Sequence, residues 1–354
     1  MFRQTVLKVF AALLAGLLLP AVPVSRSLGC LWAQKTNGQQ TIRDSLNREV
    51  TLPSPIQRVA TNGGVLEEWI LMLGGESKLV ATSVSNQKNP WFLKMFPSIQ
   101  RLPAVFTQGG DVSMEMLLST NPQAVIMLSG LTVQLSVEKA HLPVVVLERR
   151  NGEDIKRSTL LLGRLLGSRE EEVAKRFCAY YDDNLRRVQS RTAKLPPQKR
   201  TRVYYVAAGT PLNTDGANTM SADWIQQAGG INVAAAAGID GMNRTVSMEQ
   251  IMLWNPEVII SSTHIAAATI LSNPQWANVA AVRQHRVFVN PKALYLWARN
   301  SSETALQTLW AAKTIHPELF GDIDMNRETR DFYRSFFRYQ MNDAELHEIL
   351  VPAY

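Results

Sequence analysis

The chain has 354 residues, of which 46% are apolar and 19% are charged, so it is a globular protein long enough for two domains of ordinary size. Its formal net charge is +7. Lysines and arginines do not gather in a dense cluster interleaved with aromatic residues, which argues against nucleic-acid binding, whereas the mild positive excess favours anionic ligands.

Residues 1–33 have the pattern of a secretory signal peptide, with a basic start, an apolar run broken by proline and a less apolar end. The apolar run has about 16 residues, fewer than the ~20 that a membrane-spanning helix needs. We therefore expect an exported protein. Ser27 and Leu28 depart from the pattern of a bacterial lipoprotein cleavage site, so lipid attachment at Cys30 is the less favoured alternative. Without Cys30, Cys178 is alone, which argues against a disulfide framework.

Residues 34–152 alternate between short apolar segments and amphipathic ones. A first strand is predicted to end at Asn62, and Leu66, Ile70 and Leu73 then recur at helical spacing. The segments LVATSVS, QAVIMLSG and LPVVVLE are predicted as further strands. This alternation predicts a parallel sheet that is covered by helices on both faces.

Residues 153–198 form the predicted connection to a second lobe. Their apolar residues recur every three or four positions, which predicts one long amphipathic helix over roughly residues 169–194. These apolar residues are Val173, Phe177, Tyr181, Leu185 and Val188. Residues 199–325 repeat the order of the first lobe, and residues 326–354 are predicted to be helical and to pack on the second lobe. The predicted fold class is α/β, with two lobes that each hold a central parallel sheet and one long bridging α-helix.

One motif occurs in both lobes: DVSMEMLLSTNPQAVIM at residues 111–127 and TVSMEQIMLWNPEVIIS at residues 245–261. In each copy a serine can cap a helix whose first turn carries Glu115 or Glu249. The helix dipole favours an acid there by ~0.3 to 1 kcal/mol. Capping explains a glutamate in either copy, but it does not require a matched pair.

The motifs that mark common catalytic and metal sites are missing from the sequence. GxSxG, HExxH, CxxC, Walker A and GxGxxG are all absent. A bare metal ion would need three or four converging His, Asp, Glu or Cys ligands, and the chain has five histidines without a second ligand at useful spacing. We therefore predict neither catalytic residues, nor a cofactor, nor a protein-bound metal.

Taken together, these segments resemble the periplasmic substrate-binding proteins of bacterial ABC importers for iron-siderophore, haem and cobalamin complexes. The similarity runs from Thr41 to about Phe320 and is carried by both VSME repeats and by TIRDSLNREVTLPSPIQRVA, ADWIQQAGGINVAA, VRQHRVFVNP and ETALQTLWAAKTIHPELF. It implies two Rossmann-like lobes, a bridging helix and a ligand groove between the lobes.

The resemblance also implies a function and partners. The protein would be a monomer that captures a metal chelate in the periplasm, a ferric siderophore first, and delivers it to an inner-membrane permease dimer. In the family, the glutamates that correspond to Glu115 and Glu249 form salt bridges with arginines of the two-fold symmetric permease. The alternative is an enzyme on the same scaffold, a chelatase or hydrolase acting on a tetrapyrrole or siderophore. An enzyme would have no use for the matched glutamates, nor would a carrier without a transporter.

Candidate ligand contacts lie in loops beyond the carboxyl ends of the strands. Tyr295 and Trp297 would share one side of an extended segment and could stack on a chelate, while Arg299 could meet its carboxylate or catecholate oxygens. His264 is either a metal ligand or a plain polar loop residue. The full set of predicted ligand contacts is Asn62, Trp91, Thr210, Leu212, His264, Tyr295, Trp297 and Arg299.

Overall fold

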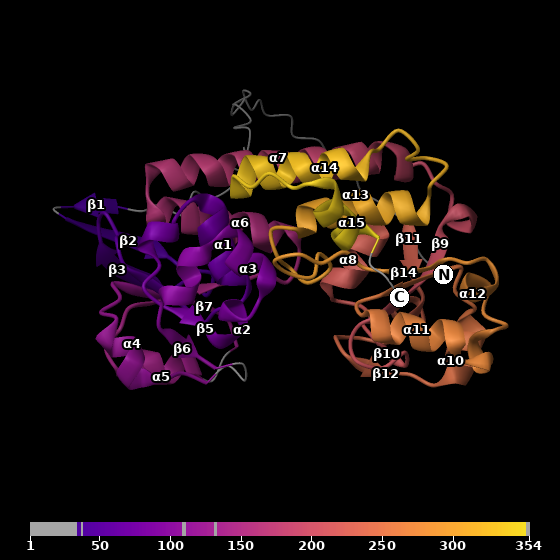
Figure 1. Ribbon diagram of the computed structural model, residues 1–354, viewed down its shortest axis with the longest axis horizontal. Helices are drawn as coiled ribbons and strands as arrows, with labels where there is room; N and C mark the ends of the chain where they lie inside the picture. Colours follow the sequence, from indigo (N-terminus) through magenta and orange to yellow (C-terminus); the bar gives the residue numbers. More distant parts are fainter. Residues whose placement is uncertain (1–33, 37, 108–110, 131–132, 352–354) are drawn as a thin grey trace, which may run out of the picture. The chain divides into compact units, whose positions relative to one another are not determined.

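The computed structural model describes residues 34–36, 38–107, 111–130 and 133–351. The predicted signal peptide and Cys30 lie outside these residues. An antiparallel three-stranded sheet comes first in the chain, and it consists of β1 (Gln34–Thr36), β2 (Gln39–Arg43) and β3 (Glu49–Pro53). The rest of the described chain forms two α/β lobes and a C-terminal helical segment (Figure 1).

The first lobe contains a parallel sheet in the order β4-β7-β8. Successive residues of β7 point to opposite faces, so Ala124 and Ile126 enter one apolar core while Val125 and Met127 enter another. Helices therefore cover both faces, as the sequence predicts. The elements are β4 (Val59–Thr61), β5 (Thr82–Ser83), β6 (Ala104–Phe106), β7 (Ala124–Leu128), β8 (Val144–Leu147), α1 (Val65–Leu73), α2 (Val84–Gln87), α3 (Pro90–Met95), α4 (Met114–Ser119) and α5 (Val133–Lys139).

The second lobe has the sheet order β12-β10-β9-β13-β14, with β11 also paired to β9. Strands β11, β9, β13 and β14 are parallel, whereas β10 and β12 add an antiparallel edge. The elements are β9 (Thr201–Val206), β10 (Asn213–Thr214), β11 (Gly230–Asn232), β12 (Arg244–Thr245), β13 (Val258–Ser261), β14 (Val287–Val289), α8 (Met220–Gln227), α9 (Val233–Ala236), α10 (Met248–Trp254), α11 (His264–Ser272), α12 (Ala280–Arg283) and α13 (Thr304–Ile315).

The predicted bridging helix is α7 (Ser168–Thr192), which follows α6 (Gly152–Leu166). Val173, Phe177, Tyr181 and Val188 are buried along one stripe, and Leu185 is partly buried beside them. Helix α7 contacts α1 of the first lobe and both α8 and α13 of the second (Figure 1). One apolar core consequently extends through both lobes.

Two local predictions differ from the structure. The predicted strand LVATSVS is reduced to Thr82–Ser83, because the Ser83 hydroxyl accepts the backbone N–H of Asn86 and starts α2 instead. Ser113 makes no side-chain cap, whereas Ser247 forms a capping box with Gln250. A capping box needs a side-chain acceptor at the third helical residue, which is Gln250 in the second repeat. The first repeat has Met116 there, and its side chain cannot accept the backbone N–H of Ser113.

The C-terminal segment consists of α14 (Met325–Phe332), a π-helical turn (Tyr333–Phe337) and α15 (Asp343–Leu350). The prediction that this segment packs on the second lobe holds for α14, which contacts α13 of that lobe, but not for Phe336 and Phe337. Phe336 contacts Phe177 of α7, and Phe337 contacts Phe96 beside α3 of the first lobe. The segment therefore returns across the bridging helix and reaches the first lobe.

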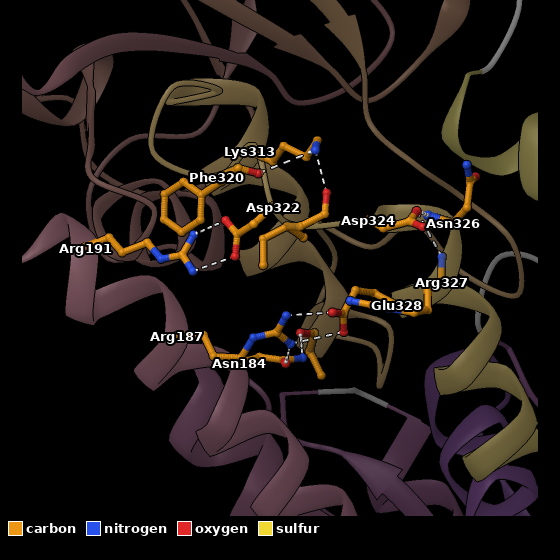
Figure 2. Close-up of polar contacts among 12 residues, drawn as sticks. Asn184, Arg187, Arg191, Lys313, Phe320, Asp322, Asp324, Asn326, Arg327 and Glu328 are labelled. Carbon is orange, nitrogen blue, oxygen red and sulfur yellow. Dashed lines mark hydrogen bonds and ion pairs between the residues drawn. The ribbon is translucent and has the colours of Figure 1, made fainter.

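Two arginines of α7 hold α14 and the loop that precedes it, as Figure 2 shows. Arg187 donates two hydrogen bonds to the Glu328 carboxylate, at 2.6 and 3.1 Å. Arg191 meets both oxygens of Asp322 and lowers the pKa of this carboxyl to about 2. Bidentate pairs of this kind fix geometry as well as charge.

We predict that Arg187→Ala lowers the free energy of unfolding by about 1–3 kcal/mol, because it leaves the largely buried Glu328 without its partner. Arg186→Ala is the matched control on the same helix, since the Arg186–Asp183 pair is exposed and contributes ~0 to 1 kcal/mol. Urea denaturation followed by circular dichroism measures both. Equal losses in the two variants would contradict the anchoring role of Arg187.

Candidate functional site

A cavity of about 1010 Å³ lies where α2 and α3, the strand ends of the second lobe, and α15 come together. Its residues are Ser85, Asn86, Lys88, Asn89, Pro90 and Trp91 of the first lobe, Ala207–Gly209, Ser262–His264, Asn290 and Lys292–Leu296 of the second, and His347, Glu348, Ile349 and Val351. The segments from the second lobe follow β9, β13 and β14 directly. This position matches the rule that ligands bind at the carboxyl ends of parallel strands.

Asn89 positions the first-lobe side of the cavity. Its side-chain oxygen caps α3 by accepting the Trp91 N–H at 2.9 Å, and its side-chain nitrogen donates to the Leu294 carbonyl at 2.9 Å. One residue thus orients Trp91 and joins the two lobes. The Trp91 ring is 7% exposed and lies 4.5 Å from the Lys94 ammonium, measured to the ring centroid.

The loop after β14 forms much of the opposite wall, and a buried carboxylate holds it. The N–H groups of Leu294 and Tyr295 donate to the two oxygens of Glu303, at 3.2 and 2.7 Å. The Tyr333 hydroxyl donates to the same carboxylate from the C-terminal segment. Burial raises the pKa of Glu303 to about 8. The position of this wall loop is therefore fixed by hydrogen bonds to Glu303, which is fully buried.

Two further buried glutamates follow each other at the start of α1. Glu67 accepts hydrogen bonds from Thr82 at 2.5 Å and from Asn86 at 2.7 Å, and burial raises its pKa to about 7. Glu68 reaches across to the second lobe, where it accepts the Ser302 N–H at 3.1 Å. Burial and the neighbouring Glu303 raise the pKa of Glu68. Glu67 thus holds Asn86 of the first-lobe wall. Glu68 holds the residue next to Glu303, which in turn holds the second-lobe wall.

The cavity lining favours a negatively charged ligand. Lys88 and Lys292 are exposed, and neither takes part in an ion pair with another described residue. Thr263 and His264 form the N-terminus of α11, where the helix dipole is positive. Among the described residues, no group of three or more His, Cys, Asp or Glu is arranged to hold a metal ion. The lining can thus bind an anionic organic or inorganic group through ammonium, hydroxyl and aromatic contacts.

Three predicted ligand contacts come together in the cavity. Trp91, His264 and Tyr295 all line it, from α3, α11 and the loop after β14 respectively. His264 is exposed and Tyr295 is half-buried.

The other predicted contacts lie outside the lining. Trp297 is fully buried in the core, because the loop turns back in an antiparallel bridge between Lys292 and Leu296 instead of running extended. Arg299 donates to the Ala207 carbonyl at 2.5 Å.

The remaining three predicted contacts are also not among the residues that line the cavity. Thr210 is exposed, Leu212 packs on the second-lobe core, and Asn62 is half-buried.

Sequence reasoning missed Lys88, Asn89, Lys292, His347 and Glu348. Lys292 lies in the loop after a predicted strand. The rule that ligand contacts lie beyond the carboxyl ends of strands, which identified Tyr295, could therefore also have identified Lys292. Asn89 before Pro90 is a recognisable helix start. His347 and Glu348 gave no comparable signal, because they lie on a C-terminal helix that only the fold brings to the cavity.

A comparison with known protein families shows to which family the chain belongs. The sequence pattern of the periplasmic binding protein family matches residues 59–294. The chain belongs to this family. It is therefore the periplasmic binding protein of an ABC importer and not an enzyme. No helix among the described residues is long and apolar enough to cross a membrane.

Individual relatives agree with this assignment. The chain is 26% identical over 330 residues to the molybdate-binding protein MolA of Haemophilus influenzae, covering 84% of this chain and 90% of MolA. The crystal structure of a periplasmic solute-binding protein from Veillonella parvula is 25% identical, with a TM-score of 0.77 over 88% of this chain and 97% of that one. Molybdate-bound MolA has a TM-score of 0.75 at 23% identity, over 85% and 99% of the two chains.

The buried carboxyls predict a pH dependence of stability. Their folded-state pKa values, about 7 for Glu67 and about 8 for Glu303, lie above the ordinary value of 4.5. Between about pH 5 and 8 the folded protein keeps protons that the unfolded chain releases, so stability falls as pH rises through this window.

We predict that Glu68→Gln, which removes one ionisable group from the buried pair of Glu68 and Glu303, reduces this fall, because burial and Glu303 raise the pKa of Glu68 in the folded protein. Urea denaturation at pH 5, 6, 7 and 8 measures the change in free energy of unfolding. Glu172→Gln on the exposed face of α7 is the control and should keep the wild-type slope. A slope for Glu68→Gln equal to that of the control would contradict the raised pKa.

Proposed function

We propose that the protein captures an anionic metal chelate, a ferric siderophore first, in this cavity and delivers it to a permease dimer in the inner membrane. The observation that carries the proposal is the cavity of about 1010 Å³, which combines aromatic side chains with two ammonium groups that form no ion pair with any described residue. Binding sites of roughly 300–1,000 Å³ are typical for organic ligands of drug size. The organic part of a chelate is large enough to fill a cavity of this volume. A small oxyanion would fill only a fraction of it, and water would occupy the rest.

The lining also fits the chemistry of a chelate. Trp91 and Tyr295 come from opposite lobes and place aromatic side chains in the cavity lining, where they can contact aromatic or aliphatic arms of a ligand. Lys88 and Lys292 provide the positive charge that carboxylate or catecholate oxygens need. Ser262 and Thr263 add polar contacts at the start of α11. Bound iron would keep its ligands from the chelator, so the protein needs no metal-binding cluster of its own.

Molybdate or a similar oxyanion is the second candidate. It is favoured by the 26% identity to the molybdate-binding protein MolA. Lys292 and the N-terminus of α11 would hold a small dianion at the second-lobe side of the cavity. In that case the aromatic walls would contribute little to affinity.

Tryptophan fluorescence titrations with ferric tris-catecholate, ferric tris-hydroxamate, haem, cobalamin and molybdate separate the two candidates. We predict that a ferric chelate binds more tightly than molybdate. Tyr295→Ala should weaken chelate binding by ~1–3 kcal/mol, the scale of one large aromatic contact. Tyr295→Phe keeps the ring and should keep most of the affinity. Tight binding of molybdate without binding of any chelate would replace the first candidate by the second.

The repeated motif supports the docking part of the proposal, because it forms the same surface module on each lobe. Glu115 of α4 and Glu249 of α10 are both exposed at the second helical position. Two residues later Leu117 and Ile251 are fully buried and fix each helix to its lobe.

The residues that follow Leu117 and Ile251 also have similar exposure in the two modules. Leu118 is 47% exposed and Met252 is 49% exposed, so each glutamate is accompanied by an outward apolar side chain. Asn121 and Asn255 then end the two modules with φ values of 45° and 42°. A two-fold symmetric permease needs the same contact twice, which two such modules on one chain would supply.

We predict that Glu115→Arg combined with Glu249→Arg abolishes permease-dependent uptake and leaves folding and ligand affinity nearly unchanged. Losing half of a buried interfacial ion pair costs ~2–5 kcal/mol, whereas a free surface charge costs ~0–1 kcal/mol. Uptake into proteoliposomes that contain the permease, together with fluorescence titration, measures both properties. Glu49→Arg with Glu172→Arg makes the same change of charge on exposed residues elsewhere and should transport normally. Normal uptake by the Glu115/Glu249 variant would remove the docking role.

A further inference from the structure

Helix α15 forms part of the cavity wall although it lies beyond residues 59–294, which match the family pattern. Leu346 and Ile349 face the core and are 1% and 0% exposed. His347 and Glu348 lie on the exposed side of the helix and line the cavity. The C-terminal segment thus contributes two polar side chains to a site that the two lobes otherwise form.

The start of α15 is held firmly against the first lobe. Asn342 and Glu345 form a reciprocal capping box, and the Glu345 carboxylate also accepts hydrogen bonds from Tyr339 at 2.6 Å and Lys94 at 3.0 Å. Lys94 belongs to α3 and lies over the Trp91 ring. The position of α15 is therefore tied to the same helix that brings Trp91 to the cavity.

Glu348 gives this wall its charge. Among the described lining residues it is the one carboxylate, in a cavity that also holds Lys88 and Lys292. It takes part in no ion pair with another described residue, whereas Glu345 and Asp343 of the same helix pair with Lys94 and Arg330. An unpaired carboxylate at this place repels ligand oxygens and attracts cationic or hydrogen-bond-donating groups.

We propose that Glu348 sets the charge selectivity of the cavity, so that α15 discriminates against the most negatively charged chelates and favours ligands of lower net charge or with an amine or other donor group. This inference rests on the proposed ligand-binding function of the cavity. The two lysines attract an anionic group of the ligand, whereas Glu348 on α15 repels further negative charge on the same ligand.

Titration of the wild-type protein and Glu348→Gln with two ferric complexes tests the inference. Ferric tris-catecholate carries three negative charges and ferric tris-hydroxamate carries none. The variant should bind the tris-catecholate complex about 3- to 10-fold more tightly, because a repulsive charge at short range has been removed. Its affinity for the neutral complex should change less than about twofold. Glu172→Gln, which removes a distant exposed charge, should behave like the wild type because salt screens charges beyond about 10 Å.

A second measurement needs no bound chelate. Iodide, caesium and acrylamide quench tryptophan fluorescence as an anion, a cation and a neutral molecule. A Tyr295→Trp substitution at the half-buried lining position supplies the reporter, because Trp91 is only 7% exposed, and its contribution follows from subtracting the matching protein that keeps Tyr295. Glu348→Gln should raise quenching of this reporter by iodide, lower quenching by caesium and leave acrylamide unchanged. An unchanged ratio of iodide to caesium quenching, or the same change in Glu172→Gln, would overturn the role of Glu348. Failure of the wild-type protein to bind any chelate would count against the proposed function, while the quenching ratio would still decide on Glu348.

Discussion

The buried carboxylate of Glu303 links the parts of the molecule that make the cavity. Its oxygens accept the N–H groups of the wall loop at Leu294 and Tyr295, and Tyr333 of the C-terminal segment donates to it. The hydrogen bond from Ser302 to Glu68 ties the neighbouring residue to the first lobe. A carboxyl group without solvent is costly unless such partners satisfy it. Any displacement of the loop, the tail or the first lobe would therefore leave a buried oxygen without a partner.

This constraint explains why two lobes behave as one framework. The apolar core is continuous through both of them, and α7 packs on helices of each. Asn89 adds a direct hydrogen bond from the first lobe to the carbonyl of Leu294. Lobes that are hinged by extended strands can close widely around a ligand, whereas a stiff helix and a shared core restrict such motion. We therefore expect only slight closure of the two lobes when a ligand binds.

The C-terminal segment has a larger part in the site than its position in the chain indicates. Two bidentate arginine–carboxylate pairs hold α14 and the loop before it to α7 (Figure 2). Phe336 and Phe337 then carry the segment across to the first lobe. It then places α15 beside Trp91. The two lobes supply aromatic rings and ammonium groups that suit an anionic ligand, and the tail adds the opposing charge of Glu348. We therefore propose that ligand choice depends on the two lobes and on the C-terminal segment together.

The sequence by itself determined the architecture, since strand alternation and the apolar stripe of α7 depend on local periodicity that any core must bury. It also determined the matched pair Glu115 and Glu249 and placed Trp91, His264 and Tyr295 near strand or helix ends. Only the tertiary structure decided that Trp297 enters the core, because a two-residue spacing puts side chains on one side only in extended chain, and the loop turns at Lys292. It alone decided that Glu348 reaches the cavity, because contacts between residues far apart in the chain leave no local pattern.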